Sequence, residues 1–210
     1  MSRVVIGLVV LLVAVAFPLQ PASANLLTNP GFENGDLSGW SLWGPGFRSS
    51  TWPGDVHSGA DGCVNDVDNS PGDEWRGIFQ TVDVTAGQTY EYTAYLKGAN
   101  IENTKSESWL ELQWFDNSGS QISQVQSTHM TADQDWTLTG SDSYVAPVGA
   151  VTASVRWIVH KDPAQTLDNT DWHIADDFTF DQAVPEPAAA GLLGIGLLAV
   201  VHLRSRRRQG

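Results

Sequence analysis

This sequence of 210 residues has one cysteine and few basic residues. Its one cysteine, Cys63, has no partner for a disulfide within the chain, so packing has to stabilise the folded state. We expect Cys63 to be a buried, inert thiol, because His57 is the only histidine near it in the sequence. Lysines and arginines number 11 against 24 aspartates and glutamates, a formal net charge of −13 at pH 7. Such an acidic surface repels phosphate backbones, which excludes nucleic acid as a partner.

Recognisable catalytic motifs are also missing. The sequence has no Gly-x-Ser-x-Gly, His-Glu-x-x-His or phosphate-loop pattern. A glycosidase needs two carboxylates at a set separation. In a chain with so many acidic residues, the presence of carboxylates does not distinguish a glycosidase from a protein that is not an enzyme. We therefore expect a protein that is not an enzyme. The remaining alternative is an accessory module or a weak glycoside hydrolase.

Long apolar runs occur at the two ends of the chain. At the N-terminus, Arg3 is followed by the apolar residues 4–17 and then by Ala22-Ser23-Ala24. This order predicts a secretory signal peptide over residues 1–24, cut by signal peptidase between Ala24 and Asn25. The alternative for both terminal runs is a pair of buried core helices.

The C-terminal tail, residues 184–210, joins a proline pair to an apolar run and a cluster of arginines. Pro185, Glu186 and Pro187 precede the apolar residues 188–203, which are slightly short of the roughly twenty that a membrane-spanning helix needs. The arginines after them favour the cytoplasmic side, so the rest of the chain would lie outside. This tail resembles the PEP-CTERM sorting signal of Gram-negative bacteria. The resemblance implies transient anchoring in the inner membrane, processing by an exosortase near Pro-Glu-Pro, and delivery to the cell surface or extracellular matrix.

Between the two ends, residues 25–183 have the pattern of one all-β domain. Short segments of alternating, β-branched and aromatic residues are separated by turn residues about every ten positions. The clearest segments are 77–84, 89–99, 109–116, 121–127, 136–147, 150–161 and 172–181. They predict a single β-sandwich or jelly roll, flanked by an N-terminal signal peptide and a C-terminal apolar sorting helix.

The same region resembles a known family of modules. Residues 25–44 (NLLTNPGFENGDLSGWSLWG), 77–99, 110–120 and 173–180 (HIADDFTF) occur in the order found in CenC-type carbohydrate-binding modules. The resemblance implies a galactose-binding-like jelly roll that often carries one structural calcium ion and usually binds glycans. Nine tryptophans lie between residues 40 and 172, and tryptophan serves both cores and sugar-stacking platforms.

Three acidic residues are candidates for a calcium site. Alternation along the last strand places Asp176 on the inward side with Phe178 and Phe180, and a buried carboxylate needs a partner. If the first and last strands are neighbours, as in the family, Glu33 faces Asp176 or Asp177, and calcium would relieve their repulsion. Alternatively, Asp176 accepts hydrogen bonds from backbone amides and Glu33 pairs with an arginine. The acidic residues 66–74 lack EF-hand spacing, and we expect an ordinary solvated loop there.

Alternation also predicts an outward face suited to sugar. If Tyr90, Tyr92 and Leu96 point into the core, Tyr95 points out, and the same count places four polar residues outward on later strands. An aromatic platform beside hydrogen-bonding groups is the chemistry of a sugar groove, and two tryptophans could form its walls. The expected ligand site comprises Tyr95, Glu111, Gln113, Arg156, His160, Trp75 and Trp172. The alternative is an ordinary solvated sheet face.

Two functions follow from these patterns. The first is a surface or matrix protein that binds extracellular polysaccharide. The second is a calcium-stabilised structural component of the matrix with no specific glycan ligand. The tryptophan content and the family resemblance favour the first.

Overall fold

The computed structural model describes residues 25–68, 72–101, 105–163 and 170–183. This part of the chain contains ten strands and no helix. The strands are β1 (Ser41–Trp43), β2 (Phe47–Ser50), β3 (Gly62–Val67), β4 (Glu74–Asp83), β5 (Thr89–Ala99), β6 (Ser106–Phe115), β7 (Gln121–Gln126), β8 (Gln134–Val145), β9 (Thr152–Lys161) and β10 (Asp171–Gln182).

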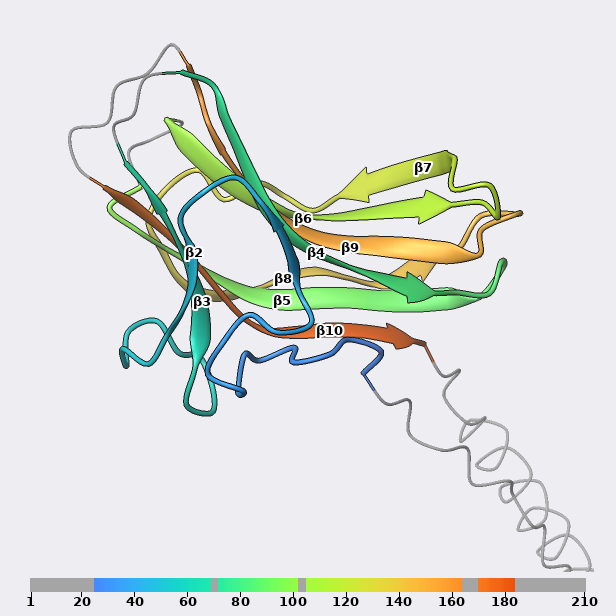
Figure 1. Cartoon of the computed structure of the whole chain (residues 1–210), viewed down its shortest axis with the longest axis horizontal. Helices are drawn as coiled ribbons and strands as arrows, with labels where there is room; N and C mark the ends of the chain where they lie inside the picture. Colours follow the sequence, from blue (N-terminus) through green and yellow to red (C-terminus); the bar gives the residue numbers. More distant parts are fainter. Residues whose placement is uncertain (1–24, 69–71, 102–104, 164–169, 184–210) are drawn as a thin grey trace, which may run out of the picture.

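The strands form two five-stranded sheets that pack against each other as a sandwich (Figure 1). Sheet A has the order β1-β4-β9-β6-β7, and sheet B has the order β2-β3-β10-β5-β8. The paired strands run antiparallel. The expected all-β sandwich is therefore confirmed, and consecutive strands such as β5 and β6 lie in different sheets.

The core lies between the sheets and follows the expected alternation on most strands. On β5, Tyr90, Tyr92, Ala94 and Leu96 are no more than 2% exposed. Every second residue of β6 and β9 is buried in the same core, which includes Leu110, Leu112, Trp114, Ala153, Val155, Trp157 and Val159. Cys63 is fully buried there, and burial raises the pKa of its thiol well above the ordinary range. An un-ionised, inaccessible thiol is inert, as the sequence predicted.

Strand β10 departs from the expected alternation at Asp176. This residue pairs with Tyr95, whereas Phe180 pairs with Tyr92, and the register shifts between Asp176 and Thr179. Directly opposite residues share a face, so Asp176 lies with Tyr95 on the outer side of sheet B. Asp177, with a φ of 50°, is the extra residue of this β-bulge. The expectation that Asp176 points inward with Phe178 and Phe180 is therefore wrong, because a simple count of residues does not reveal a bulge.

The segment before β1 has no strand but closes one side of the core. Phe32, Trp40 and Phe178 form an aromatic cluster with ring centroids 4.9 to 5.9 Å apart. The Phe178 amide donates to the Pro30 carbonyl at 3.0 Å. The first segment and the last strand are thus neighbours, as the family resemblance implied, and Trp40 is a core residue.

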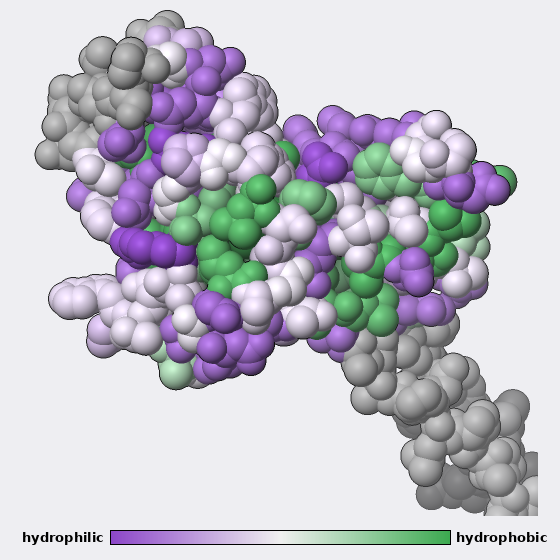
Figure 2. All heavy atoms as spheres, viewed as in Figure 1, coloured by the Kyte–Doolittle hydropathy of each residue, from purple (hydrophilic) through white to green (hydrophobic). Residues whose placement is uncertain are grey.

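The surface of the sandwich is not uniformly polar. Figure 2 shows hydrophilic residues around much of the viewed side, with several patches of hydrophobic residues between them. Leu42, on edge strand β1, is 46% exposed.

Candidate functional site

Five of the seven expected ligand residues lie together on sheet A. Glu111 and Gln113 are on β6, Arg156 and His160 on β9, and Trp75 on β4. They alternate with core residues on their strands and therefore point to the side of the sheet away from the core. We call this side outer face A, defined by Trp43, Trp75, Phe79, Trp109, Glu111, Gln113, Arg156 and His160.

Glu111 is the centre of a polar network on outer face A. It is only 4% exposed, and its oxygens accept hydrogen bonds from the side-chain amides of Gln113 (2.6 Å) and Gln126 (2.8 Å). Arg156, directly opposite on β9, approaches Glu111 at 3.8 Å and donates to the Ser154 hydroxyl at 2.9 Å. Burial lowers the pKa of the Arg156 guanidinium, although Glu111 opposes this effect. Contacts within the network hold these groups in fixed positions, and Arg156, whose side chain is 25% exposed, reaches the surface.

Two aromatic rings flank this network. The Arg156 guanidinium carbon lies 5.8 Å from the Trp43 ring centroid and 5.7 Å from that of Phe79. Trp43 lies directly over Gly77 of the neighbouring strand: a Cβ at Gly77 would be 2.0 Å from the indole. Glycine at this position therefore lets the indole settle onto the sheet. Trp43 and Phe79 are not among the residues expected from the sequence, although alternation along β4 places Phe79 two positions after Gly77 and on the same side.

The other end of outer face A combines tryptophan and histidine. Trp75 is 51% exposed and stacks on His160, with ring centroids 4.1 Å apart. His160 contacts Asp73 at 2.8 Å and Glu107 at 3.2 Å, and Glu107 also contacts His129 at 2.9 Å. Burial acts to raise the pKa of Glu107, but hydrogen bonds from the two histidines leave that pKa below its usual value. The Trp75 ring is thus oriented by a polar network behind it while one side stays open to solvent.

Tyr95 and Trp172 lie elsewhere, on sheet B. Tyr95 points to the side of β5 away from the core, where the His57 ring stacks on it at 3.6 Å between centroids. Trp172, on β10, lies on the same outer side, which we call outer face B and define by Tyr95, Trp172 and Asp176. The two sheets pack core to core, so outer faces A and B are on opposite sides of the molecule. The single groove expected from the sequence therefore separates into two groups.

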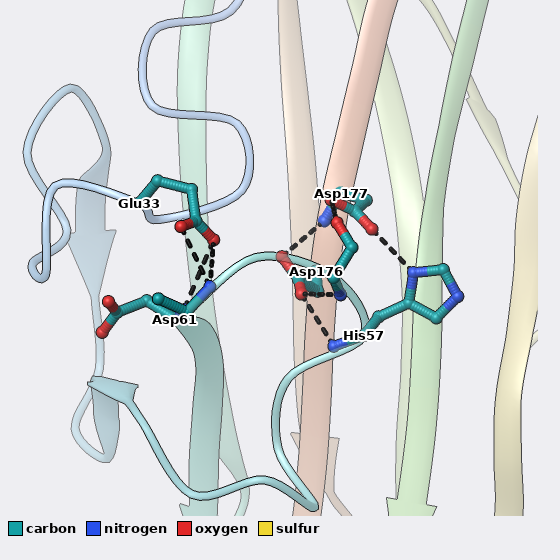
Figure 3. A network of polar contacts seen from close by, with 7 residues as sticks. Glu33, His57, Asp61, Asp176 and Asp177 are labelled. Atoms are coloured by element: carbon teal, nitrogen blue, oxygen red, sulfur yellow. Dashed lines mark hydrogen bonds and ion pairs between the residues drawn. The ribbon is translucent and has the colours of Figure 1, made fainter.

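The three expected calcium ligands gather beneath the loop of residues 51–61. Figure 3 shows Glu33 reaching this loop near Asp61, while Asp176 and Asp177 lie beside His57. A Cβ at Gly31 would be 3.5 Å from Asp177 Oδ1 and 3.6 Å from Asp176 Oδ1, which shows how closely the two carboxylates converge.

Hydrogen-bond donors of the protein already satisfy these carboxylates. Asp176 accepts from the amides of His57 (2.9 Å), Ser58 (3.2 Å) and Asp177 (2.7 Å). Asp177 contacts the His57 ring at 2.6 Å and accepts from the Ser58 hydroxyl at 2.8 Å. Burial nonetheless raises the pKa of Asp176 to about 6, against the lowering effect of its backbone hydrogen bonds.

Glu33 accepts from the Ala60 and Asp61 amides at 3.0 to 3.3 Å, and no arginine of the described residues pairs with it. Within the ranges that the structure describes, no group of three acidic, histidine or cysteine side chains is arranged to hold a metal ion. A calcium ion at Glu33, Asp176 and Asp177 therefore stays a prediction, and it would need backbone carbonyls as further ligands.

Comparison with known proteins identifies the tail. Residues 183–208 match the PEP-CTERM protein-sorting motif, which marks an exported protein with a C-terminal sorting signal. Pro185, Glu186 and Pro187 belong to this match. The signal peptide over residues 1–24 and the apolar helix over residues 188–203 lie outside the described residues and stay predictions. The described residues contain no helix long and apolar enough to cross a membrane.

Several solved structures with the same fold are carbohydrate-binding modules. TmCBM61, solved with β-1,4-galactotriose, is 21% identical, with a TM-score of 0.55 over 77% of this chain and all of that one. The C-terminal family 22 carbohydrate-binding module of Clostridium thermocellum Xyn10B is 19% identical, with a TM-score of 0.52 over 76% of this chain and 96% of that one.

An enzyme also contains this fold. The enzymatically active domain of tailspike protein 4 from bacteriophage CBA120 is 13% identical, with a TM-score of 0.58 over 76% of this chain and 21% of that one. No curated protein sequence matches the chain. At these identities the likenesses show a shared jelly-roll fold and leave ligand and activity to be argued from the site.

Proposed function

We propose that this exported protein binds a neutral extracellular polysaccharide through outer face A and has no catalytic role. The observation that carries the proposal is the Glu111–Arg156 network between aromatic rings. Sugar hydroxyls need donors and acceptors in fixed positions, and the apolar side of a pyranose stacks on an aromatic ring. The carbohydrate-binding modules with this fold support the same ligand class.

The tail supports the place of action. We propose that an exosortase processes the chain near Pro185–Pro187 after transient anchoring in the inner membrane of a Gram-negative bacterium. The domain then reaches the cell surface or the extracellular polysaccharide, where an acidic protein can meet neutral glycans without electrostatic repulsion. Comparing the mass of the cell-surface protein with that of the full chain tests this step. A mature protein that retains residues 188–210 would contradict it.

Affinity electrophoresis tests the binding proposal. The domain of residues 25–183, which contains every described strand and their shared core, is run through gels containing xylan, β-1,4-galactan or dextran. We expect one polysaccharide to retard the domain and Arg156→Ala to lose about tenfold or more in affinity, because hydrogen bonds to a charged group contribute about 1.5–3 kcal/mol. Leu138→Ala, on an exposed part of sheet B, is the matched control and should behave as the wild type.

The alternative function, a calcium-stabilised matrix component without a glycan ligand, gives a different result. No gel would then retard the domain, while calcium would raise its melting temperature and a chelator would lower it. Retardation that Arg156→Ala leaves unchanged would contradict the assignment of outer face A as the site.

A further inference from the structure

Outer face B carries a groove of its own, on the opposite side of the sandwich from outer face A. Its volume is about 470 Å³, within the range of about 300–1,000 Å³ typical of small-molecule sites. The lining comes from β2, the loop that follows it, the end of β5 and the start of β10. The residues that matter for its chemistry are Arg48, Ser50, Trp52, Asp55, Trp172 and Ile174.

Trp52 forms an exposed but positioned wall of this groove. The residue is 66% exposed, yet its amide and carbonyl are fixed by Ser50 and by the Asp55 amide, which donates to the Trp52 carbonyl at 2.8 Å. The indole also lies against Gly54, where a Cβ would be 2.8 Å from Trp52 Nε1. An exposed aromatic ring held in this way offers its face to a ligand at little cost in side-chain entropy.

The loop that carries Trp52 is itself fastened to sheet B. The Lys97 ammonium group donates to the Gly54 carbonyl at 3.0 Å. Further along, Asp176 accepts from the amides of His57 and Ser58, and the His57 ring stacks on Tyr95 (Figure 3 shows the Asp176–His57 contact). The carboxylates first considered as calcium ligands therefore also hold the groove in shape. A pre-formed groove binds more tightly than one that must be ordered on binding.

The second wall is Trp172, with hydrogen-bonding groups beside it. The Arg48 guanidinium carbon lies 5.4 Å from the Trp172 ring centroid, and the Arg48 side chain is 42% exposed. Arg48 is paired with Asp66 at 3.2 Å, and Asp55 accepts from the Ser50 hydroxyl at 2.7 Å. Because these carboxylates offset the arginine, the groove has no excess positive charge for an anionic sugar.

We propose that this groove is a second glycan-binding site, which takes a neutral pyranose unit of a polysaccharide. Two indole rings offer stacking surfaces, while Arg48, Ser50 and Asp55 supply donors and acceptors for hydroxyl groups. The site does not depend on outer face A, and either can bind if the other does not. With both sites, one molecule holds two polysaccharide strands on opposite sides and cross-links them.

Indole N–H resonances of the domain distinguish the two sites in one titration. Trp172 reports on the groove and Trp75 on outer face A, with assignments from single tryptophan variants. The probes are the methyl β-glycosides of glucose, galactose and xylose. We expect one probe to shift Trp172 saturably, with affinity about tenfold weaker in Trp52→Ala and unchanged in Trp75→Ala. The amide spectrum of Trp52→Ala should otherwise match the wild type, because the ring is mostly exposed.

The remaining outcomes separate the two proposals. A shift at Trp75 alone overturns the second site and leaves outer face A intact. A shift at Trp172 alone supports the second site and contradicts binding of that sugar by outer face A. No shift at Trp172 with any of the three probes overturns the second site. Light scattering of soluble xylan or galactan then tests cross-linking, which Trp52→Ala and Trp75→Ala should each weaken and Val148→Ala, at a fully exposed position, should leave unchanged.

Discussion

His173 should make the sandwich lose stability as the pH falls, by an amount that the structure sets. Its side chain is fully buried, with Nε2 2.9 Å from the Ser106 hydroxyl and no hydrogen-bond partner for Nδ1 among the described residues. Burial, together with the nearby positive charge of Arg76, lowers the pKa of His173 from 6.5 to about 3. The unfolded chain therefore takes up a proton below pH 6.5, while the folded protein resists it down to about pH 3.

The sign and size follow from this difference. The contribution of the uncharged His173 to the free energy of unfolding is fully present above pH 6.5. It is lost as the pH falls, because the unfolded state then binds more protons than the folded state. Since pH 5 lies about 1.5 units below the pKa of His173 in the unfolded chain, the loss in the free energy of unfolding there is on the order of 2 kcal/mol. Asp176, whose pKa is raised to about 6, acts in the opposite direction, since its folded form gains a proton first. The effect of His173 must therefore be isolated by comparison with a variant.

Urea unfolding at pH 7 and pH 5, followed by tryptophan fluorescence, provides that comparison. His173→Gln removes the titrating group and keeps a polar side chain beside Ser106. The variant loses some stability at both pH values, but its loss between pH 7 and pH 5 should be smaller than that of the wild type by on the order of 2 kcal/mol. Equal pH dependence in the two proteins would refute the reasoning.

Three further perturbations test other parts of the structure. Phe178→Ala removes a buried ring that packs on Phe32 and Trp40, so we expect a loss of about 3–5 kcal/mol in the free energy of unfolding, measured in urea; a loss below 1 kcal/mol, roughly the scale of a surface change, would contradict this packing. Gly77→Ala places a methyl group where the Trp43 indole lies, so glycan retardation should weaken while near-native stability is retained; unchanged retardation would show that Trp43 does not contact the glycan. Calcium should raise the melting temperature, and Asp177→Asn, which tolerates the same backbone conformation, should reduce that rise. A melting temperature that neither calcium nor a chelator changes would contradict the predicted calcium site.

Much of the fold could be predicted from the sequence, because alternating burial leaves a direct imprint on long strands. The predicted segment 89–99 coincides with β5, and the residues expected to point inward from β5, β6 and β9 are buried. β1, β2 and β3 were missed. β1 and β2 are short edge strands whose pattern is weak, and every residue but one of β3 is buried, so it does not alternate.

The candidate site was predictable only in part, for two physical reasons. Alternation shows which side of a strand a residue occupies but not which sheet contains the strand, so Tyr95 was grouped with Glu111 although β5 and β6 lie in different sheets. The bulge at Asp177 adds one residue and reverses the side on which Asp176 lies. Trp52 stands in a loop with no periodic pattern, and Lys97, which holds this loop through the Gly54 carbonyl, comes from a strand more than forty residues away in the sequence.

The central claim is that outer face A binds a polysaccharide, and the affinity of Trp75→Ala tests it most directly. Isothermal titration would use the residue 25–183 domain and oligosaccharides of the polysaccharide that retards it most. Trp75 is half exposed and stacks on His160 at the surface, so its removal should leave the fold intact. We predict an affinity about tenfold lower than that of the wild type, with the urea midpoint unchanged. Equal affinity in the two proteins would contradict the claim.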